Sequence, residues 1–77
     1  MKITYDPEKD ILQIVLADKP VEETAQITPG LILDYDENDH LVGLELRKAS
    51  KAMDNPYSIA YLVGEADLNK PRPTVRE

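Results

Sequence analysis

Carboxylate and amide side chains that could bind a metal ion are concentrated between residues 34 and 45. The candidate ligands are Asp34, Asp36, Asn38 and Glu45. They stand at the first, third, fifth and twelfth places of the stretch, which is the ligand spacing of an EF-hand calcium loop. The sixth place of such a loop requires glycine, and this chain has Asp39 there. Both flanks alternate like strands rather than helices. We therefore interpret the stretch as an acidic hairpin turn, and weak metal binding, or an enzyme that uses the Asp34–Glu45 segment, is the alternative.

No other group of residues has the composition of a catalytic or cofactor-binding site. His40 is the only histidine, and neither Ser50 nor Ser58 lies in a Gly-x-Ser-x-Gly nucleophile motif. The three glycines are too far apart to form a phosphate-binding loop. The absence of cysteine excludes disulfides and cysteine-ligated zinc. The sequence thus predicts that the protein is not an enzyme and has no catalytic residues and no cofactor.

Apolar side chains alternate with other residues at a period of two through most of the first half of the chain, which is typical of half-buried strands. The alternating sets are Ile3 and Tyr5; Leu12, Ile14 and Leu16; Leu31, Leu33 and Tyr35; and Val42, Leu44 and Leu46. A shorter, polar strand over residues 21–27 is expected at a sheet edge. Turn-forming residues separate these segments, as at Thr28-Pro29-Gly30.

The stretches 5–16 and 35–46 echo each other. Each begins with Tyr-Asp, continues through an acidic turn and ends in an alternating strand. The echo is either an old duplication or one hairpin solution that the chain uses twice, and we favour the second interpretation. Gly43, inside the last of these strands, indicates a bulge or a close approach of another backbone.

The character of the chain changes after residue 46. Residues 47–53 contain good helix formers and predict a short helix, which Asn55-Pro56 should end. Residues 57–63 fit a helix by the spacing of Tyr57 and Tyr61, but the alternation of Ile59, Tyr61 and Val63 favours a strand. Residues 67–77 have two prolines and no apolar period, so they predict an extended or disordered tail that follows a single domain at residues 1–66.

These elements predict an α+β fold that is mainly β, with a small antiparallel meander sheet, one short helix and a further C-terminal strand at residues 57–63. The chain has 77 residues and no Phe or Trp, so its core is thin. Small domains of this kind often gain stability by oligomerising, and we expect a homo-oligomer, with a dimer favoured. If residues 57–63 form an edge strand, its candidate interaction residues are Tyr57, Ile59 and Tyr61.

The net charge of −6 opposes nucleic-acid binding, because such binding depends on neutralising phosphates. The basic residues at 70–76 are too few to reverse that expectation, and a basic protein is the better-matched partner. No stretch approaches the ~18 apolar residues of a membrane-spanning helix. The first residues also lack the apolar run of a signal peptide. We therefore predict a cytoplasmic protein without membrane contact.

Several short motifs occur in a recognisable order. They are Tyr5-Asp6-x-x-x-Asp10 followed by Leu12, Ile14 and Leu16; Glu23-Thr24; Pro29-Gly30; Asp34-Tyr35-Asp36; Val42-Gly43-Leu44-Glu45-Leu46; and Ala49-Ser50. Over about residues 2–53 this order resembles the prokaryotic family called domain of unknown function 2283. Members of that family usually have glycine in the second acidic turn, where this chain has Asp39.

The resemblance implies an uncharacterised bacterial or archaeal cytosolic protein, and it brings no established activity and no catalytic residues. It also implies an alternative, an antitoxin-like role in which the chain is the partner of a neighbouring basic protein. From the residues themselves, we expect a non-enzymatic protein-interaction module that self-associates.

Overall fold

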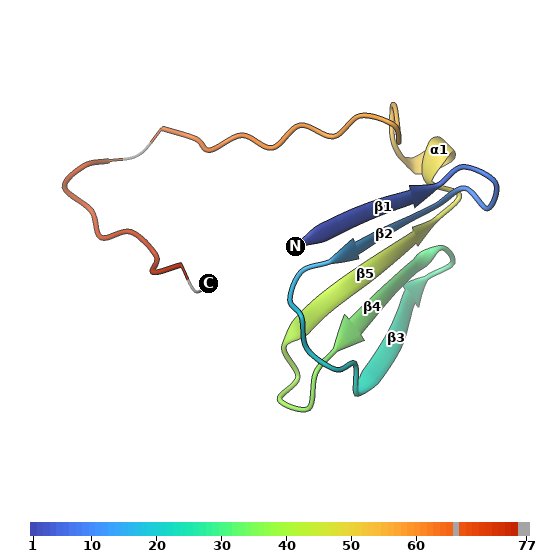
Figure 1. Ribbon diagram of the computed structural model, residues 1–77, viewed down its shortest axis with the longest axis horizontal. Helices are drawn as coiled ribbons and strands as arrows, with labels where there is room; N and C mark the ends of the chain where they lie inside the picture. Colours follow the sequence, from blue (N-terminus) through green and yellow to red (C-terminus); the bar gives the residue numbers. More distant parts are fainter. Residues whose placement is uncertain (66, 76–77) are drawn as a thin grey trace.

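The computed structural model describes residues 1–65 and 67–75, and in these residues five strands form one antiparallel sheet with a single short helix (Figure 1). The elements are β1 (Lys2–Asp6), β2 (Ile11–Val15), β3 (Glu23–Thr28), β4 (Leu31–Tyr35), β5 (Leu41–Arg47) and α1 (Ala49–Ala52). The mainly β, α+β class that the alternation predicts is confirmed. Helix α1 is shorter than the predicted 47–53, because Arg47 still pairs with Ile11 of β2 and Lys48 adopts a left-handed conformation.

The strand order is β1-β2-β5-β4-β3, and every neighbouring pair is antiparallel. The prediction of a meander is therefore wrong in one respect: β5, not β3, lies beside β2. The physical reason is composition. Strand β5 is apolar enough for a central place, whereas β3 has the sequence Glu-Thr-Ala-Gln-Ile-Thr and lies at the edge, where its polar side chains stay in water.

The hairpins β1–β2 and β4–β5 are built alike. Each turn has one aspartate at its start: Asp6 ends β1, and Asp36 follows β4. The Oδ1 atom of each aspartate accepts hydrogen bonds from two backbone N–H groups of its turn. Ile14 of β2 lies directly opposite Leu44 of β5, and these two residues occupy equivalent places in the two hairpins. The hairpins are thus related by an approximate two-fold axis perpendicular to the sheet, with their turns at opposite ends (Figure 1).

The register sorts the side chains onto two faces. The members of the apolar face are Ile3, Tyr5, Leu12, Ile14, Leu31, Leu33, Leu44 and Leu46. The other face is mainly polar. Among the residues that the structure describes, the buried apolar ones are Leu12 and Val42 (each 3% exposed), Gly43, Ala49 and Pro56, and no large side chain is fully buried. The centre of the apolar face is half-buried, because the described elements form a single layer and α1 lies at the end of the sheet (Figure 1).

The further strand predicted at residues 57–63 does not form. This segment is extended and runs away from α1 without pairing with the sheet (Figure 1). Its alternation satisfies the local preference for a strand, but no neighbouring strand supplies hydrogen bonds. Residues 67–75 contain neither helix nor strand. Residue 66, the predicted domain boundary, and residues 76–77 of the predicted tail lie outside the described residues.

In the part of the chain that the structure describes, no helix is long and apolar enough to cross a membrane.

Candidate functional site

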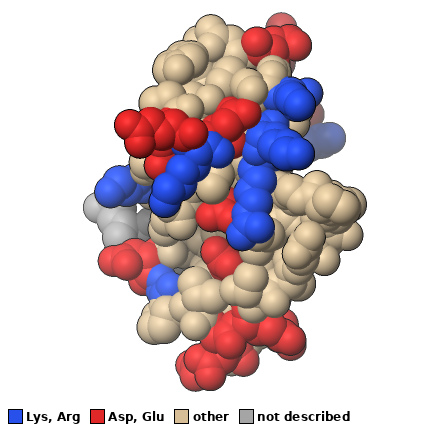
Figure 2. Space-filling view, turned by 90° about the vertical axis from the view of Figure 1, so that its right-hand side faces the viewer, with Lys and Arg blue, Asp and Glu red and all other residues tan. Residues whose placement is uncertain are grey.

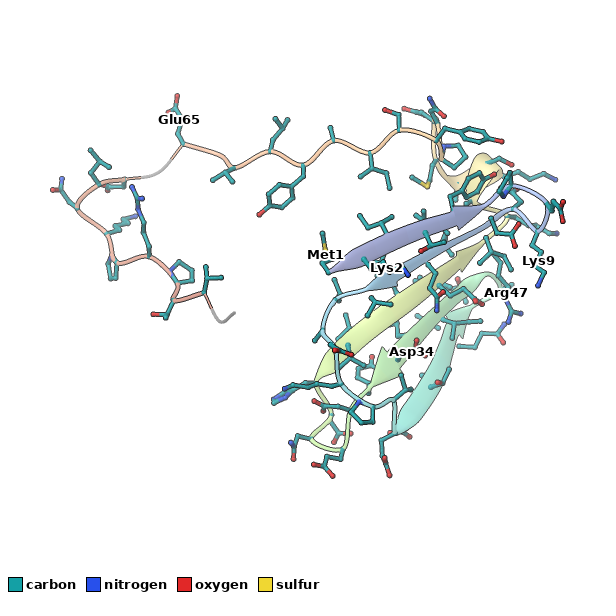
Figure 3. The ribbon with its side chains drawn as sticks, in the orientation of Figure 1. Met1, Lys2, Lys9, Asp34, Arg47 and Glu65 are labelled. Carbon is teal, nitrogen blue, oxygen red and sulfur yellow. The ribbon has the colours of Figure 1, made fainter. Side chains whose placement is uncertain are left out.

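The four candidate metal ligands lie on different elements and have other partners. Asp34 is on β4, opposite Gly43, and its Oδ1 atom accepts a hydrogen bond from the Thr24 hydroxyl at 2.9 Å. Glu45 is on β5, and its Oε2 atom accepts a hydrogen bond from Arg47 Nε at 3.0 Å. Figure 3 shows Asp34 and Arg47 at separate places on the sheet. Each of these two carboxylates thus accepts a hydrogen bond from a different side chain, Asp34 from Thr24 and Glu45 from Arg47, and they share no partner among the described residues.

Asp36 is the most buried of the four, at 5% exposed. Its Oδ1 atom accepts hydrogen bonds from the backbone N–H groups of Asn38 and His40, each at 2.9 Å. The bond from His40 is the largest cause that holds the pKa of Asp36 below its ordinary value, and the nearby charges of His40 and Lys19 act in the same direction. Asp36 is thus an ionised carboxylate that stabilises its own turn.

The described residues contain no group of three or more His, Cys, Asp or Glu side chains placed to hold a metal ion. The hairpin explains this, because it places Asp34 and Glu45 on two strands and Asn38 in the exposed turn between them. His40 and Ser50 also lie apart, one in the β4–β5 turn and one in α1 at the other end of the sheet (Figure 1). The EF-hand spacing in the sequence therefore does not become an EF-hand geometry.

A cluster that residue patterns in the sequence do not indicate surrounds Asp10. The Tyr5 hydroxyl donates to Asp10 Oδ1 at 2.7 Å, and the Ser50 backbone N–H donates to the same atom at 2.9 Å. The Ser50 hydroxyl donates to Asp10 Oδ2 at 2.5 Å, and the Ala49 N–H donates to the backbone carbonyl of Asp10 at 3.0 Å. Asp10 thereby ties the β1–β2 turn to α1. The sequence contained one sign of this cluster: the motifs by which the chain resembles its family include Asp10 and Ala49-Ser50.

The hydrogen bonds of this cluster shift the pKa values of Tyr5 and Asp10 in opposite directions. The hydrogen bond to Asp10 is the main cause that raises the pKa of Tyr5 to about 12. Hydrogen bonds from Ser50, and then from Tyr5, hold the pKa of Asp10 below its ordinary value. A carboxylate of lowered pKa is a weak base. Tyr5 stays neutral and Asp10 stays charged across the neutral pH range.

The ring of Tyr5 contacts the start of the extended segment at residues 57–63. Tyr57 packs against it edge to face, with 5.1 Å between the ring centroids, a preferred geometry for aromatic pairs. Pro56 beside it is buried. Next to this contact lies an open groove of about 460 Å³, lined by aliphatic, proline and tyrosine side chains: Ile3, Tyr5, Pro7, Leu12, Pro56, Tyr57, Ile59 and Tyr61. The three interaction residues predicted from the sequence are therefore brought together with the β1 side of the apolar face.

A second hollow, of about 450 Å³, lies between the β3–β4 turn and α1. Its charged lining residues are all basic: Arg47, Lys48 and Lys51. Arg47 is paired with Glu45. Figure 2, which looks onto this side of the molecule, shows acidic side chains next to the basic ones. The surface around this hollow is of mixed charge rather than a continuous basic patch.

One comparison with known proteins gives a match. The model of the family described as "Protein of unknown function (DUF2283)" matches residues 2–50, which contain all five strands and the start of α1. Neither the curated proteins nor the solved structures give a match to this chain.

Proposed function

The chain belongs to the DUF2283 family of proteins of unknown function, and from that premise we propose that it is a non-enzymatic protein-interaction module that self-associates, with a homodimer as the expected assembly. We further propose that the apolar face of the sheet is the main contact. A cytoplasmic setting, as the sequence predicts, belongs to the same proposal.

The single-layer sheet is the observation that carries the proposal. A sheet with one apolar face needs a second layer to cover that face, and stable domains are built from two or more packed layers. Here Leu33 and Leu44, at the centre of the apolar face, are only half-buried. A second copy of the same face would supply the missing layer, as in a β-sandwich, where two sheets pack about 10 Å apart.

The hydrogen bonds of the polar side chains support the non-enzymatic part of the proposal. Asp36 holds its own turn, Asp10 ties α1 to a hairpin, and Glu45 is paired with Arg47. Each of these side chains thus has a structural task that accounts for its position.

Substituting Leu33 with glutamate should convert the dimer into a monomer. Leu33 lies at the centre of the apolar face between Ala25 and Leu44, so the new carboxylate would have to be buried without a partner, at a cost of several kcal/mol. We expect the dissociation constant to rise by at least ~100-fold, which corresponds to ~2.7 kcal/mol. Analytical ultracentrifugation over a concentration series measures this change.

Ile32→Glu is the matched control. Ile32 is the preceding residue of β4 and projects from the opposite, polar face, where it lies beside Glu45. This variant should dimerise like the unaltered chain, and circular dichroism should show that both variants stay folded. An unaltered chain that is monomeric at every concentration up to the millimolar range would refute self-association.

A basic protein partner is a second candidate, and the surface charge favours it. Acidic side chains gather at the lower end of the molecule in Figure 2. That end holds the β4–β5 turn, where Glu37 and Asp39 are exposed, together with the exposed Glu22 and Glu23 near the start of β3. An antitoxin-like protein that covers a basic neighbour would use a surface of this kind.

A partner held by this acidic end should be lost as salt is raised, because screening weakens exposed charge contacts. A tagged pull-down from lysate of the native host, at low and high salt, measures this loss. The double variant Glu37→Lys and Asp39→Lys should abolish capture at low salt, and Lys70→Glu should not. Capture that is equal at both salt concentrations would count against the acidic end as the contact.

A further inference from the structure

The extended segment after α1 has an unusual composition for an exposed chain. Residues 57–64, hereafter the arm, contain no charged side chain, although 31% of the whole chain is charged. The large side chains of the arm are nonetheless exposed: Tyr57 75%, Ile59 46%, Tyr61 82%, Leu62 87% and Val63 81%. Figure 3 shows the arm leading away from the sheet to Glu65, with its side chains projecting on both sides. An apolar segment of this length in open solvent is a candidate for contact with another chain.

The base of the arm is fixed above the apolar face. Tyr5 projects from that face, as its register partner Leu12 does. Tyr57 packs on Tyr5, and Pro56 lies in the same groove as Leu12. The arm therefore begins above the apolar face. It starts in the layer that a second sheet would occupy, not in the layer of the sheet from which it comes.

Two sets of backbone groups are available for pairing. Strand β1 is an edge strand, with β2 as its neighbour on one side and, within residues 1–65 and 67–75, no strand on the other. In the arm, the backbone hydrogen bonds that the structure records end at Ser58 N–H, which donates to the Asn55 carbonyl. An extended chain laid flat on apolar side chains would leave its N–H and C=O groups without partners, which is costly. Pairing with a free strand edge satisfies these groups.

The length and the area of the arm also fit. Eight extended residues reach ~28 Å, which exceeds the ~17 Å of a five-residue strand such as β1. The five-stranded face measures roughly 24 Å by 17 Å, or roughly 400 Å² in projection. A stable interface buries ~800 Å² of accessible surface per partner. The face alone is small by that standard, and the arm is the exposed apolar surface that would enlarge the interface.

We propose that the arm of each copy pairs with the free edge of β1 in a second copy, so that two copies exchange arms. This inference rests on the proposed self-association and specifies how it is completed. Ile59, Tyr61 and Val63 extend the partner's apolar face next to Ile3 and Tyr5, as strand alternation requires. Ala60 and Leu62 then lie on the partner's polar face, beside Lys2 and Thr4.

Disulfide trapping tests the exchange directly, because the chain has no cysteine of its own. Two single variants are prepared, Ala60→Cys in the arm and Thr4→Cys in β1, and are mixed before mild oxidation. Each chain then has one thiol, so a covalent pair of unlike chains can form only between copies. We expect the mixture to give much more covalent dimer on a non-reducing gel than either variant oxidised alone, since residues on paired strands meet the short Cβ separation that a disulfide needs.

Lys2→Cys is used in parallel with Thr4→Cys, because it covers a register shift of two residues on the same face. Gln26→Cys is the matched control, since it projects from the polar face of β3 at the opposite edge of the sheet. A dimeric protein in which neither β1 position forms the covalent pair, or in which Gln26→Cys forms it equally well, would overturn the exchange.

Charge substitutions in the arm separate the exchange from self-association itself. Tyr61 and Leu68 are equally exposed, at 82%, but Leu68 lies beyond the arm. Tyr61→Asp should raise the dimer dissociation constant by ~10-fold or more, as the loss of an interface aromatic does, and Leu68→Asp should leave it within ~2-fold. Equal effects of the two variants, with Leu33→Glu still monomeric, would overturn the exchange and leave the proposed function standing. A monomeric unaltered chain would overturn both.

Discussion

Replacing Gly43 with valine should destabilise the folded protein by about 3 kcal/mol, the upper part of the range for overpacked interiors. Gly43 is buried in the central strand β5. A Cβ atom at this position would lie 3.0 Å from the Ile14 carbonyl oxygen and 3.4 Å from Asp34 Oδ2. The first of these neighbours is backbone in β2, so it can yield only if the central pair of strands separates.

Chemical denaturation at one protein concentration measures this effect. Gly64→Val is the control, because nothing lies within 4 Å of a Cβ atom built at Gly64. It should change the free energy of unfolding by no more than ~0.5 kcal/mol, as exposed substitutions usually do. If Gly43→Val unfolds at the same denaturant concentration as the unaltered chain, the close approach of the two strands in the structure is wrong.

Truncating Leu12 to alanine should cost about 3 kcal/mol, within the range measured for buried leucines. Leu12 is 3% exposed and lies under the base of the arm with Tyr5 and Pro56. For a chain of this size, total stability is about 4–12 kcal/mol. The loss is therefore a large fraction of the whole, because so few side chains of the described residues are buried.

Leu68→Ala is the matched control truncation for this prediction. Leu68 is 82% exposed, so its side chain should contribute almost nothing to the free energy of unfolding. The tyrosine contact gives a second readout. Removing Leu12 takes away the floor on which Pro56 and Tyr57 rest, so protease cleavage after Tyr57 should become faster than in the unaltered chain. Unchanged cleavage together with unchanged unfolding would show that Leu12 does not support the arm.

Local features of the fold could be predicted from the sequence because they depend on neighbouring residues. The period of two located β1, β2, β4 and β5, and the polar stretch at residues 21–27 located the edge strand β3. The acidic turns formed where Asp6 and Asp36 can bond to the next backbone N–H groups. Gly43 indicated a bulge or a close approach, and the structure has both: the register shifts next to its partner Asp34, and a Cβ atom would crowd Ile14.

Features that depend on distant pairing could not be predicted in the same way. The strand order required knowing that β5 would displace β3 from the side of β2, and alternation contains no such information. The EF-hand spacing could not by itself distinguish a metal site from a hairpin turn, for a related reason. Ligand spacing specifies a site only on a loop of the right shape, and a hairpin places Asp34 and Glu45 on different strands.

The tie at Asp10 and the arm were the hardest features to predict. Asp10 and Ser50 are far apart in the sequence, and each looked like an ordinary turn or helix residue. The alternation in the arm correctly indicated an extended backbone. It could not indicate that the pairing partner would be missing, because β-strand preference is expressed only where an edge is within reach.

The approximate two-fold relation between the hairpins has a consequence for the order of folding. Each hairpin closes over a short turn, and isolated hairpins form in roughly 1–10 μs. Pairing of β2 with β5, with Ile14 opposite Leu44 at its centre, instead joins segments that the whole of β3 and β4 separates. Closing that longer loop costs more entropy. The two hairpins should therefore form first and independently, and their docking should set the folding rate, with Ile14 and Leu44 among the last residues to reach their native contacts.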